Sequence, residues 1–254
     1  MKRIIWSLVC ILGGSVFCSA QNTLYFPHVV NGFQTNGPGW ITGFAITNTA
    51  MPGTAIASGT ITLTQDNGTP WSITYDDGQG GPRATGSSIP FQLAGGQARL
   101  IVTRANGSLI TGFATVTSNQ PVGVAVIFVE FADFGGTRVA EAGVPAATAL
   151  TRQTVFAITG DGSNTGVAVA NPGAATVTIT FQVLNASGVM PLPSVNRTLA
   201  PRGHTAFFVS ELFPSLPEGF IGTMQIISNT PIVATALLFE STGEFATLPV
   251  FPLQ

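Results

Sequence analysis

Two segments of the chain alternate polar and apolar residues with a period of two, Thr60–Thr64 and Thr176–Val183. Successive side chains of a β-strand point to opposite faces, so each segment predicts a strand with one buried and one solvent-facing side. The side chains expected on the buried faces are Ile61 and Leu63 in the first segment, and Val177, Ile179, Phe181 and Val183 in the second.

Two other segments, Val122–Val129 and Ile232–Phe239, are almost continuously apolar. Such runs are typical of strands covered on both sides, or of strands whose outer face meets a neighbouring domain. Turn-forming residues separate the runs, as at Asp66–Gly68 and Asn185–Gly188. The one helical candidate is a single turn at Ser210–Phe213, followed directly by a proline. We therefore expect an all-β fold in which seven or eight short antiparallel strands form a sandwich in each half of the chain.

The two halves of the chain resemble each other in sequence. Gly43–Asn48 matches Gly166–Asn171, and Ile110–Val122 matches Phe220–Ile232, in the same order. This order indicates a diverged duplication. It predicts two tandem, related domains, at residues 21–147 and 148–254. The first contains a Gly-rich insertion, residues 76–86, that the second lacks.

The segment Gly166–Phe181 resembles the opening strands of immunoglobulin-like modules that recur in bacterial secreted and cell-surface proteins. Gly243–Val250 is similar to repeats in secreted proteins of soil bacteria. The resemblance spans most of each half and consists of strand and turn patterns. It implies an immunoglobulin-like β-sandwich with a binding, spacing or adhesive role, and it assigns no functional residue.

The N-terminal segment, residues 1–20, has the pattern of a cleavable signal peptide. Lys2 and Arg3 precede an apolar run, Ile4–Phe17, and the small residues Cys18–Ala20 precede Gln21, the expected mature start. The run is shorter than the roughly 20 residues that a membrane-spanning helix needs. We expect secretion to the extracellular space or the periplasm, with no membrane span after cleavage.

Cleavage would remove both cysteines and the only lysine. Seven arginines would then face eleven acidic residues, a formal charge of −4. A weakly acidic chain with scattered arginines argues against binding to nucleic acid or to an anionic membrane. The absence of thiols and the two well-separated histidines argue against a metal site, and no cofactor motif is present. The acidic turns Asp76–Gly78 and Asp161–Asn164 are interpreted as turns rather than calcium loops.

Two arrangements could support catalysis. His204 could recruit Ser210 and Glu211 as a hydrolase would, and Glu130 and Glu240 could form a carboxylate pair. Neither has the expected context, because no nucleophile elbow is present and the duplication alone explains the paired glutamates. We interpret His28 and His204 as structural residues, and the protein as non-enzymatic.

The aromatic residues give the best functional hypothesis. Trp40, Trp71, Tyr25 and Tyr75 all lie in the first half, whereas residues 148–254 contain neither Trp nor Tyr. Trp71 and Tyr75 are four residues apart and would share one face of a strand. Indole and phenol rings suit stacking on a sugar or anchoring of a protein. The four aromatic residues are therefore the candidate ligand-binding site, and the alternative is that the tryptophans fill the core.

These patterns favour a secreted, non-enzymatic β-sandwich protein that binds or adheres to an extracellular polysaccharide or protein partner. The alternative is a structural subunit of an extracellular fibre or surface layer, formed by self-association of strand edges that no lysine protects. A secreted hydrolase is the third hypothesis.

Overall fold

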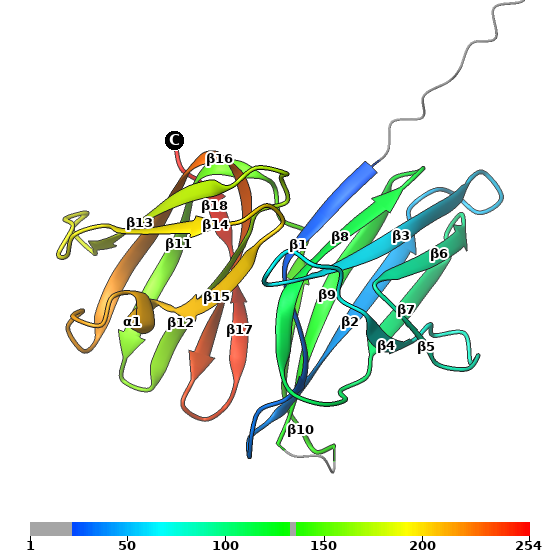
Figure 1. Ribbon diagram of the computed structural model, residues 1–254, viewed down its shortest axis with the longest axis horizontal. Coiled ribbons are helices and arrows are strands. Elements are labelled where there is room, and N and C mark those ends of the chain that lie inside the picture. The colour runs from blue at the N-terminus through cyan, green and yellow to red at the C-terminus, as the bar shows by residue number, and fades with distance from the viewer. Residues whose placement is uncertain (1–21, 133–135) are drawn as a thin grey trace, which may run out of the picture.

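The computed structural model describes residues 22–132 and 136–254, and the predicted signal peptide lies outside them. The described chain is all-β, as predicted, and forms two curled sheets that lie side by side (Figure 1). The strands of the first sheet are β1 (Asn22–Phe33), β2 (Gly39–Asn48), β3 (Ile56–Gln65), β4 (Ile73–Asp76), β5 (Ala84–Gly86), β6 (Ser88–Ala94), β7 (Ala98–Thr103), β8 (Ile110–Ser118), β9 (Val122–Phe131) and β10 (Arg138–Pro145).

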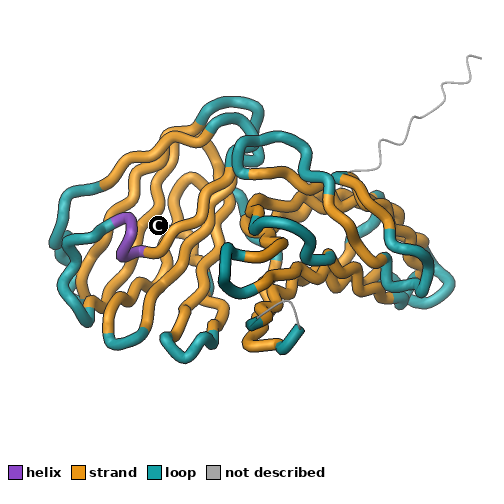
Figure 2. The backbone as a smooth tube through the Cα atoms, turned by 60° about the horizontal axis from the view of Figure 1, so that its bottom comes forward, coloured by secondary structure: helices purple, strands orange, loops and turns teal. Residues whose placement is uncertain are grey.

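The second sheet follows a short connection after Pro145. Its strands are β11 (Leu150–Gly160), β12 (Ser163–Ala170), β13 (Val177–Asn185), β14 (Val195–Leu199), β15 (His204–Phe208), β16 (Phe220–Glu240), β17 (Phe245–Leu248) and β18 (Val250–Pro252). A single-turn helix, α1 (Val209–Leu212), follows β15 and confirms the expected helical turn. Figure 2 shows that most of the backbone is in strands and that the loops lie mainly at the ends of the strands.

Both sheets curl because one strand in each changes partners along its length. In the first sheet, β1 pairs with β8 over most of its length and with β2 at Gly32 and Phe33. In the second, β11 pairs with β16 and then with β12 at Thr159 and Gly160. The ends of one strand thus join two layers, which enclose a core between them.

The two sheets share one strand order. The order is β6-β3-β8-β1-β2-β7 in the first and β14-β13-β16-β11-β12-β15 in the second. β9 pairs with β2 and β10, and the C-terminal part of β16 correspondingly pairs with β12 and β17. The N-terminal part of the long β16 therefore corresponds to β8, and its C-terminal part corresponds to β9. β4 and β5 border the Gly-rich insertion and have no counterpart in the described part of the second sheet, which explains why the first has ten strands.

Two equivalent asparagines make the same hydrogen bonds in the two sheets. Asn48 Nδ2 donates to the carbonyls of Ala55 and Leu93, at 3.0 Å each, and Asn48 Oδ1 accepts from the backbone nitrogen two residues on. Asn171 Nδ2 donates to the carbonyls of Ala175 and Ala200, at 2.7 and 2.9 Å, and its Oδ1 also accepts from the nitrogen two residues on. Both side chains are buried. The two asparagines occupy the last positions of the matching segments Gly43–Asn48 and Gly166–Asn171.

The alternating segments bury the expected faces. The side chains predicted to face inward are fully buried in β3 and β13: Ile61, Leu63, Val177, Ile179, Phe181 and Val183. The apolar run in β16 is buried on both faces from Ile232 to Leu237. One face packs in the core of the second sheet, whereas Val233 and Leu237 pack against residues of the first. The outer face of this strand thus meets the neighbouring sheet, which is one of the two predicted explanations.

Polar contacts also join the two sheets. The backbone nitrogen of His204 donates to the carbonyl of Asp66 at 3.0 Å, and Thr247 Oγ1 donates to the carbonyl of Gly143 at 2.7 Å. Phe245 lies within the hydrophobic core of the first sheet and contacts Trp40, with ring centroids 5.3 Å apart. The junction is therefore a packed, partly hydrogen-bonded interface.

Candidate functional site

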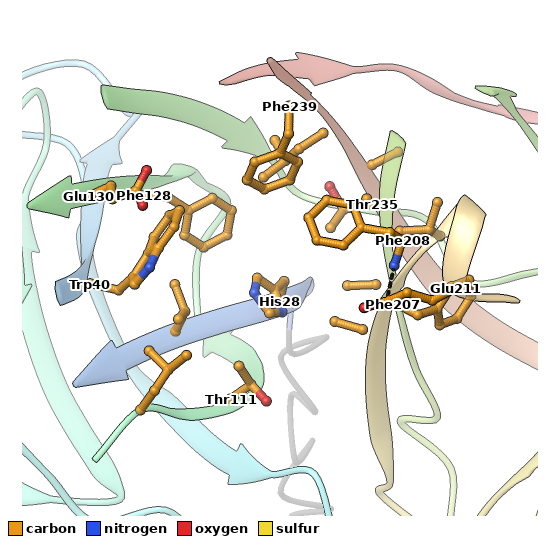
Figure 3. Close-up of a pocket in the computed structure, with 18 of the residues that line it drawn as sticks. His28, Trp40, Thr111, Phe128, Glu130, Phe207, Phe208, Glu211, Thr235 and Phe239 are labelled. Carbon is orange, nitrogen blue, oxygen red and sulfur yellow. Dashed lines mark hydrogen bonds between the residues drawn. The ribbon is translucent and has the colours of Figure 1, made fainter. Parts of the chain in front are cut away.

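A cavity of about 520 Å³ opens between the two sheets. One wall comes from β1, β2 and β9, and the other from β12, β15, β16 and α1 (Figure 3). Five aromatic residues supply most of its large apolar surface: Trp40, Phe128, Phe207, Phe208 and Phe239. Only Trp40 among them belonged to the site predicted from the sequence.

Small residues on β12 and β15 leave room for the cavity. Gly166 and Ala168 are two apart on β12, and both face the cavity together with Ala206 of β15, the cross-strand partner of Ala168. A Cβ on Gly166 would lie 2.8 Å from the ring of Phe239. The ring therefore packs directly on the glycine backbone. Phe239 also meets Phe208 edge to face, at 5.2 Å between centroids.

A chain of hydrogen-bonding side chains crosses the junction at the edge of this cavity. Asp66 Oδ1 lies 2.7 Å from His204 Nδ1, and His204 Nε2 lies 3.2 Å from His28 Nδ1. Thr111 Oγ1 donates to both carboxylate oxygens of Asp66, at 3.0 and 2.8 Å. His204 comes from the second sheet and the other three residues from the first. The imidazole of His204 is fully buried, and His28 lines the cavity beside Phe128, with ring centroids 5.4 Å apart.

Burial and the charges of neighbouring groups set the ionisation of the hydrogen-bonded residues His28 and Asp66. Burial, together with the charge of the neighbouring His204, lowers the pKa of His28 from 6.5 to about 3, against the opposing effect of Asp66. Burial would raise the pKa of Asp66, but the hydrogen bond and charge of His204, with the Thr111 hydroxyl, outweigh it and lower the pKa overall. The native protein therefore holds His28 neutral and Asp66 ionised over a wide pH range.

Two carboxylates line the cavity. Glu130 is the cross-strand partner of Trp40, and burial raises the pKa of its carboxyl. Glu211 lies at the exposed rim, where its Oε2 accepts a hydrogen bond from the backbone nitrogen of Phe208. No arginine or lysine is found among the described residues that line the cavity.

The other predicted aromatic residues lie elsewhere. Trp71, Ile73 and Tyr75 do share one face, as expected, but that face points into the core, and the two aromatic side chains are 3% and 7% exposed. Trp71 borders a separate small hollow with Asn31 and Asn106. Tyr25 packs against a cluster at the sheet junction that contains Phe113. The structure therefore does not gather the four predicted aromatic residues into one exposed surface.

The predicted alternative partners of His204 are engaged elsewhere. Ser210 Oγ accepts from Asn164 Nδ2 at 2.7 Å, and Glu211 binds the Phe208 nitrogen. Asp66 is the carboxylate that contacts His204, from 138 residues away. The sequence offered only one clue to this contact, the presence of Asp66 in a turn.

The paired glutamates have different surroundings in the two sheets. Glu240 Oε2 accepts from Ser163 Oγ at 2.7 Å and is not part of the cavity, whereas Glu130 is. Arg138 forms an ion pair with Glu141 at 2.7 Å. The β9–β10 register places Arg138 opposite Phe131, and the described residues show no ion pair between Arg138 and Glu130.

The acidic turn at Asp76–Gly78 bonds to its own backbone, as interpreted from the sequence. Asp76 Oδ1 accepts from the Gly78 nitrogen, and Asp77 Oδ1 accepts from that of Gln79. Asp76 Oδ2 also pairs with Arg104 at 2.9 Å. Residues 22–132 and 136–254 contain no group of three or more His, Cys, Asp or Glu side chains arranged to hold a metal ion.

The only helix in the described part of the chain, four residues long, cannot span a bilayer. No protein-family model matches this chain, and no curated protein matches it either. The functional argument therefore depends on the geometry of the cavity.

Proposed function

We propose that this protein is a secreted, non-enzymatic binding protein that holds an apolar group of an extracellular partner in the cavity between its two sheets. The observation that carries the proposal is the cavity itself, about 520 Å³ in volume, with five aromatic side chains and few polar groups. Ligand sites in proteins have this size and composition, and they often lie at junctions between packed units.

The scaffold is proposed to be two tandem, immunoglobulin-like β-sandwiches. The shared strand order and the matching hydrogen bonds of Asn48 and Asn171 support this interpretation. The composition of residues 1–20 and the absence of cysteine after Cys18 support secretion. In this arrangement each sandwich supplies one wall, so the ligand site exists only where both are packed together.

Binding suits the lining better than covalent catalysis. The described residues of the cavity wall include no Ser, Cys or Lys that could act as a nucleophile. The hydroxyl of Thr111 is bonded to Asp66, and that of Thr235 has no base within hydrogen-bond distance among the described residues. The predominance of aromatic and aliphatic side chains also favours an apolar group over a polysaccharide, whose hydroxyl groups would need many polar partners. Trp40 is proposed to contact the ligand, as predicted from the sequence, but in the cavity between the sheets and beside four phenylalanines rather than beside Trp71 and Tyr75.

The test is the binding of the neutral fluorescent probe N-phenyl-1-naphthylamine to the protein and to Ala206→Phe. Ala206 is exposed at the cavity wall, so a phenyl group there should fill the cavity without disturbing the core. We expect wild-type protein to enhance probe emission and Ala206→Phe to weaken binding roughly tenfold or more. Val189→Phe is the matched control, at an exposed turn far from the lining. No emission change with wild-type protein, or equal binding by both variants, would contradict the proposal.

A further inference from the structure

The charged groups of the cavity all have one sign. Glu130 and Glu211 line it, no arginine or lysine occurs among the described lining residues, and burial raises the pKa of Glu130. The described residues include no ion-pair partner for Glu130. A half-buried carboxylate without a cation is partly desolvated, and a cationic ligand would offset that cost.

His28 adds a neutral polar group to the lining. His204 Nδ1–H donates to the ionised carboxylate of Asp66 at 2.7 Å, and His204 Nε2 shares a hydrogen bond of 3.2 Å with His28 Nδ1. Since His28 Nδ1 is engaged by His204, Nε2 is the nitrogen of His28 that remains for a ligand. Figure 3 places His28 between the wall with Trp40 and Glu130 and the wall with Phe207 and Glu211. The hydrogen bonds from Asp66 to His204 and from His204 to His28 thereby hold the His28 ring in place at the cavity.

Thr235 is a second uncommitted polar group at the cavity. Its side chain is in the lining of β16, and the residue is only 6% exposed (Figure 3). Its hydroxyl has no hydrogen-bond partner among the described residues. A hydroxyl that lines a cavity and has no protein partner is available to a polar group of a ligand.

The aromatic walls also favour positive charge. The faces of Trp and Phe rings carry negative potential and attract ammonium and guanidinium groups. We propose that the cavity selects an organic cation, a primary amine or guanidinium on an apolar body, with the charged group near Glu130 and the body among the aromatic rings. This inference rests on the proposed function, because it assigns a ligand class to the same cavity.

Three probes of similar shape test the ligand class: 4-phenylbutylamine, 4-phenylbutanol and 5-phenylpentanoate, titrated by calorimetry near neutral pH. We expect the amine to bind roughly tenfold more tightly than the alcohol, and the carboxylate to bind least. If all three bind with equal affinity, or the carboxylate binds best, the ligand class is wrong and the proposed function survives. If none binds and the neutral naphthylamine probe also fails, the proposed function itself is wrong.

A pair of glutamate variants separates charge from structure. Glu130→Gln should lower the affinity for the amine roughly tenfold while leaving that for the alcohol unchanged, so alcohol binding reports an intact cavity. Glu240→Gln, at the repeat-equivalent position outside the cavity, is the matched control and should bind both probes as the wild type does. Equal loss of both probes in Glu130→Gln, or an unchanged amine affinity, would overturn the assignment of Glu130 to the cation.

Discussion

Asp66 holds the junction with both its backbone and its side chain. Its carbonyl accepts from the His204 nitrogen, and its carboxylate contacts His204 Nδ1 and Thr111 Oγ1. The turn that carries it also packs on the facing turn of the second sheet, where Gly68 lies against the carbonyl of Pro201. One residue thus sets the orientation of a buried imidazole and the spacing of two sheets.

Replacing Asp66 by alanine should therefore destabilise the protein. Asp66→Ala leaves the buried Nδ1–H of His204 without an acceptor, and we expect a loss of about 1–3 kcal/mol in the free energy of unfolding. Urea denaturation near neutral pH measures it. Asp77→Ala, which removes an exposed turn aspartate, should change stability by no more than about 0.5 kcal/mol. Equal effects of the two substitutions would show that Asp66 is only a turn residue.

The sequence predicted the turn at Asp66 but not its contact with His204. The two residues are 138 positions apart, and no local spacing encodes how two sheets pack. The aromatic residues show a related limit of sequence patterns. Alternation correctly placed Trp71 and Tyr75 on one face, and the structure shows that this face points into the core, which for Trp71 is the alternative that the sequence left open. Alternation alone does not show which face of a strand is buried, because Trp and Tyr suit both a core and a binding surface.

At the scale of strands, sequence periodicity was sufficient for most of the fold. The buried faces of β3 and β13 followed directly from alternation, and the asparagines that end the matching segments make equivalent contacts. Strand order could not be derived, because the polar and apolar pattern of one strand does not show which other strand it pairs with. The strand order of the second sheet repeats that of the first, as a duplication of the chain would predict.

Two equivalent glycines test this conservation of strand pairing. A Cβ on Gly112 in β8 would overlap the carbonyl oxygen of Thr64, and a Cβ on Gly222 in β16 would overlap that of Leu184. Each alanine substitution should force the adjoining strands apart and cost about 1–3 kcal/mol. Gly143→Ala in β10 is the control, because nothing lies within 4 Å of its added Cβ. Thermal or urea unfolding that ranks Gly143→Ala with the other two would refute the equivalence.

At the scale of the whole molecule, the chemically distinctive residues meet only at the junction. His28, Asp66 and Glu130 come from the first sheet, and His204 and Glu211 from the second. Each half alone has a hydrophobic core of ordinary composition. The sequence of either half alone therefore predicts only a β-sheet fold with a hydrophobic core. The candidate site depends on residues of both halves and on how the two sheets pack.

The same junction makes the stability of the protein depend on pH. The pKa of His28 is lowered from 6.5 to about 3 on folding, so the unfolded chain takes up this proton first as the pH falls. Stability contributed by neutral His28 is complete above about pH 6.5 and is lost progressively towards pH 3, by up to about 1.4 kcal/mol per unit. The lowered pKa of Asp66 adds a loss below its unfolded value of 3.8, whereas Glu130, with a raised pKa, acts in the opposite direction.

His28→Gln isolates the histidine contribution, because an amide can donate a hydrogen bond to His204 Nε2 or accept one from it but does not titrate. We expect the free energy of unfolding of the wild type, measured by urea denaturation, to fall between pH 6.5 and 5, and that of His28→Gln to fall less over the same interval. Glu130→Gln should instead be more stable than the wild type near neutral pH, since it removes a carboxylate whose burial is unfavourable. A wild-type stability that is flat from pH 7 to 5 would mean that His28 is protonated without cost, and that the junction is open to water in solution.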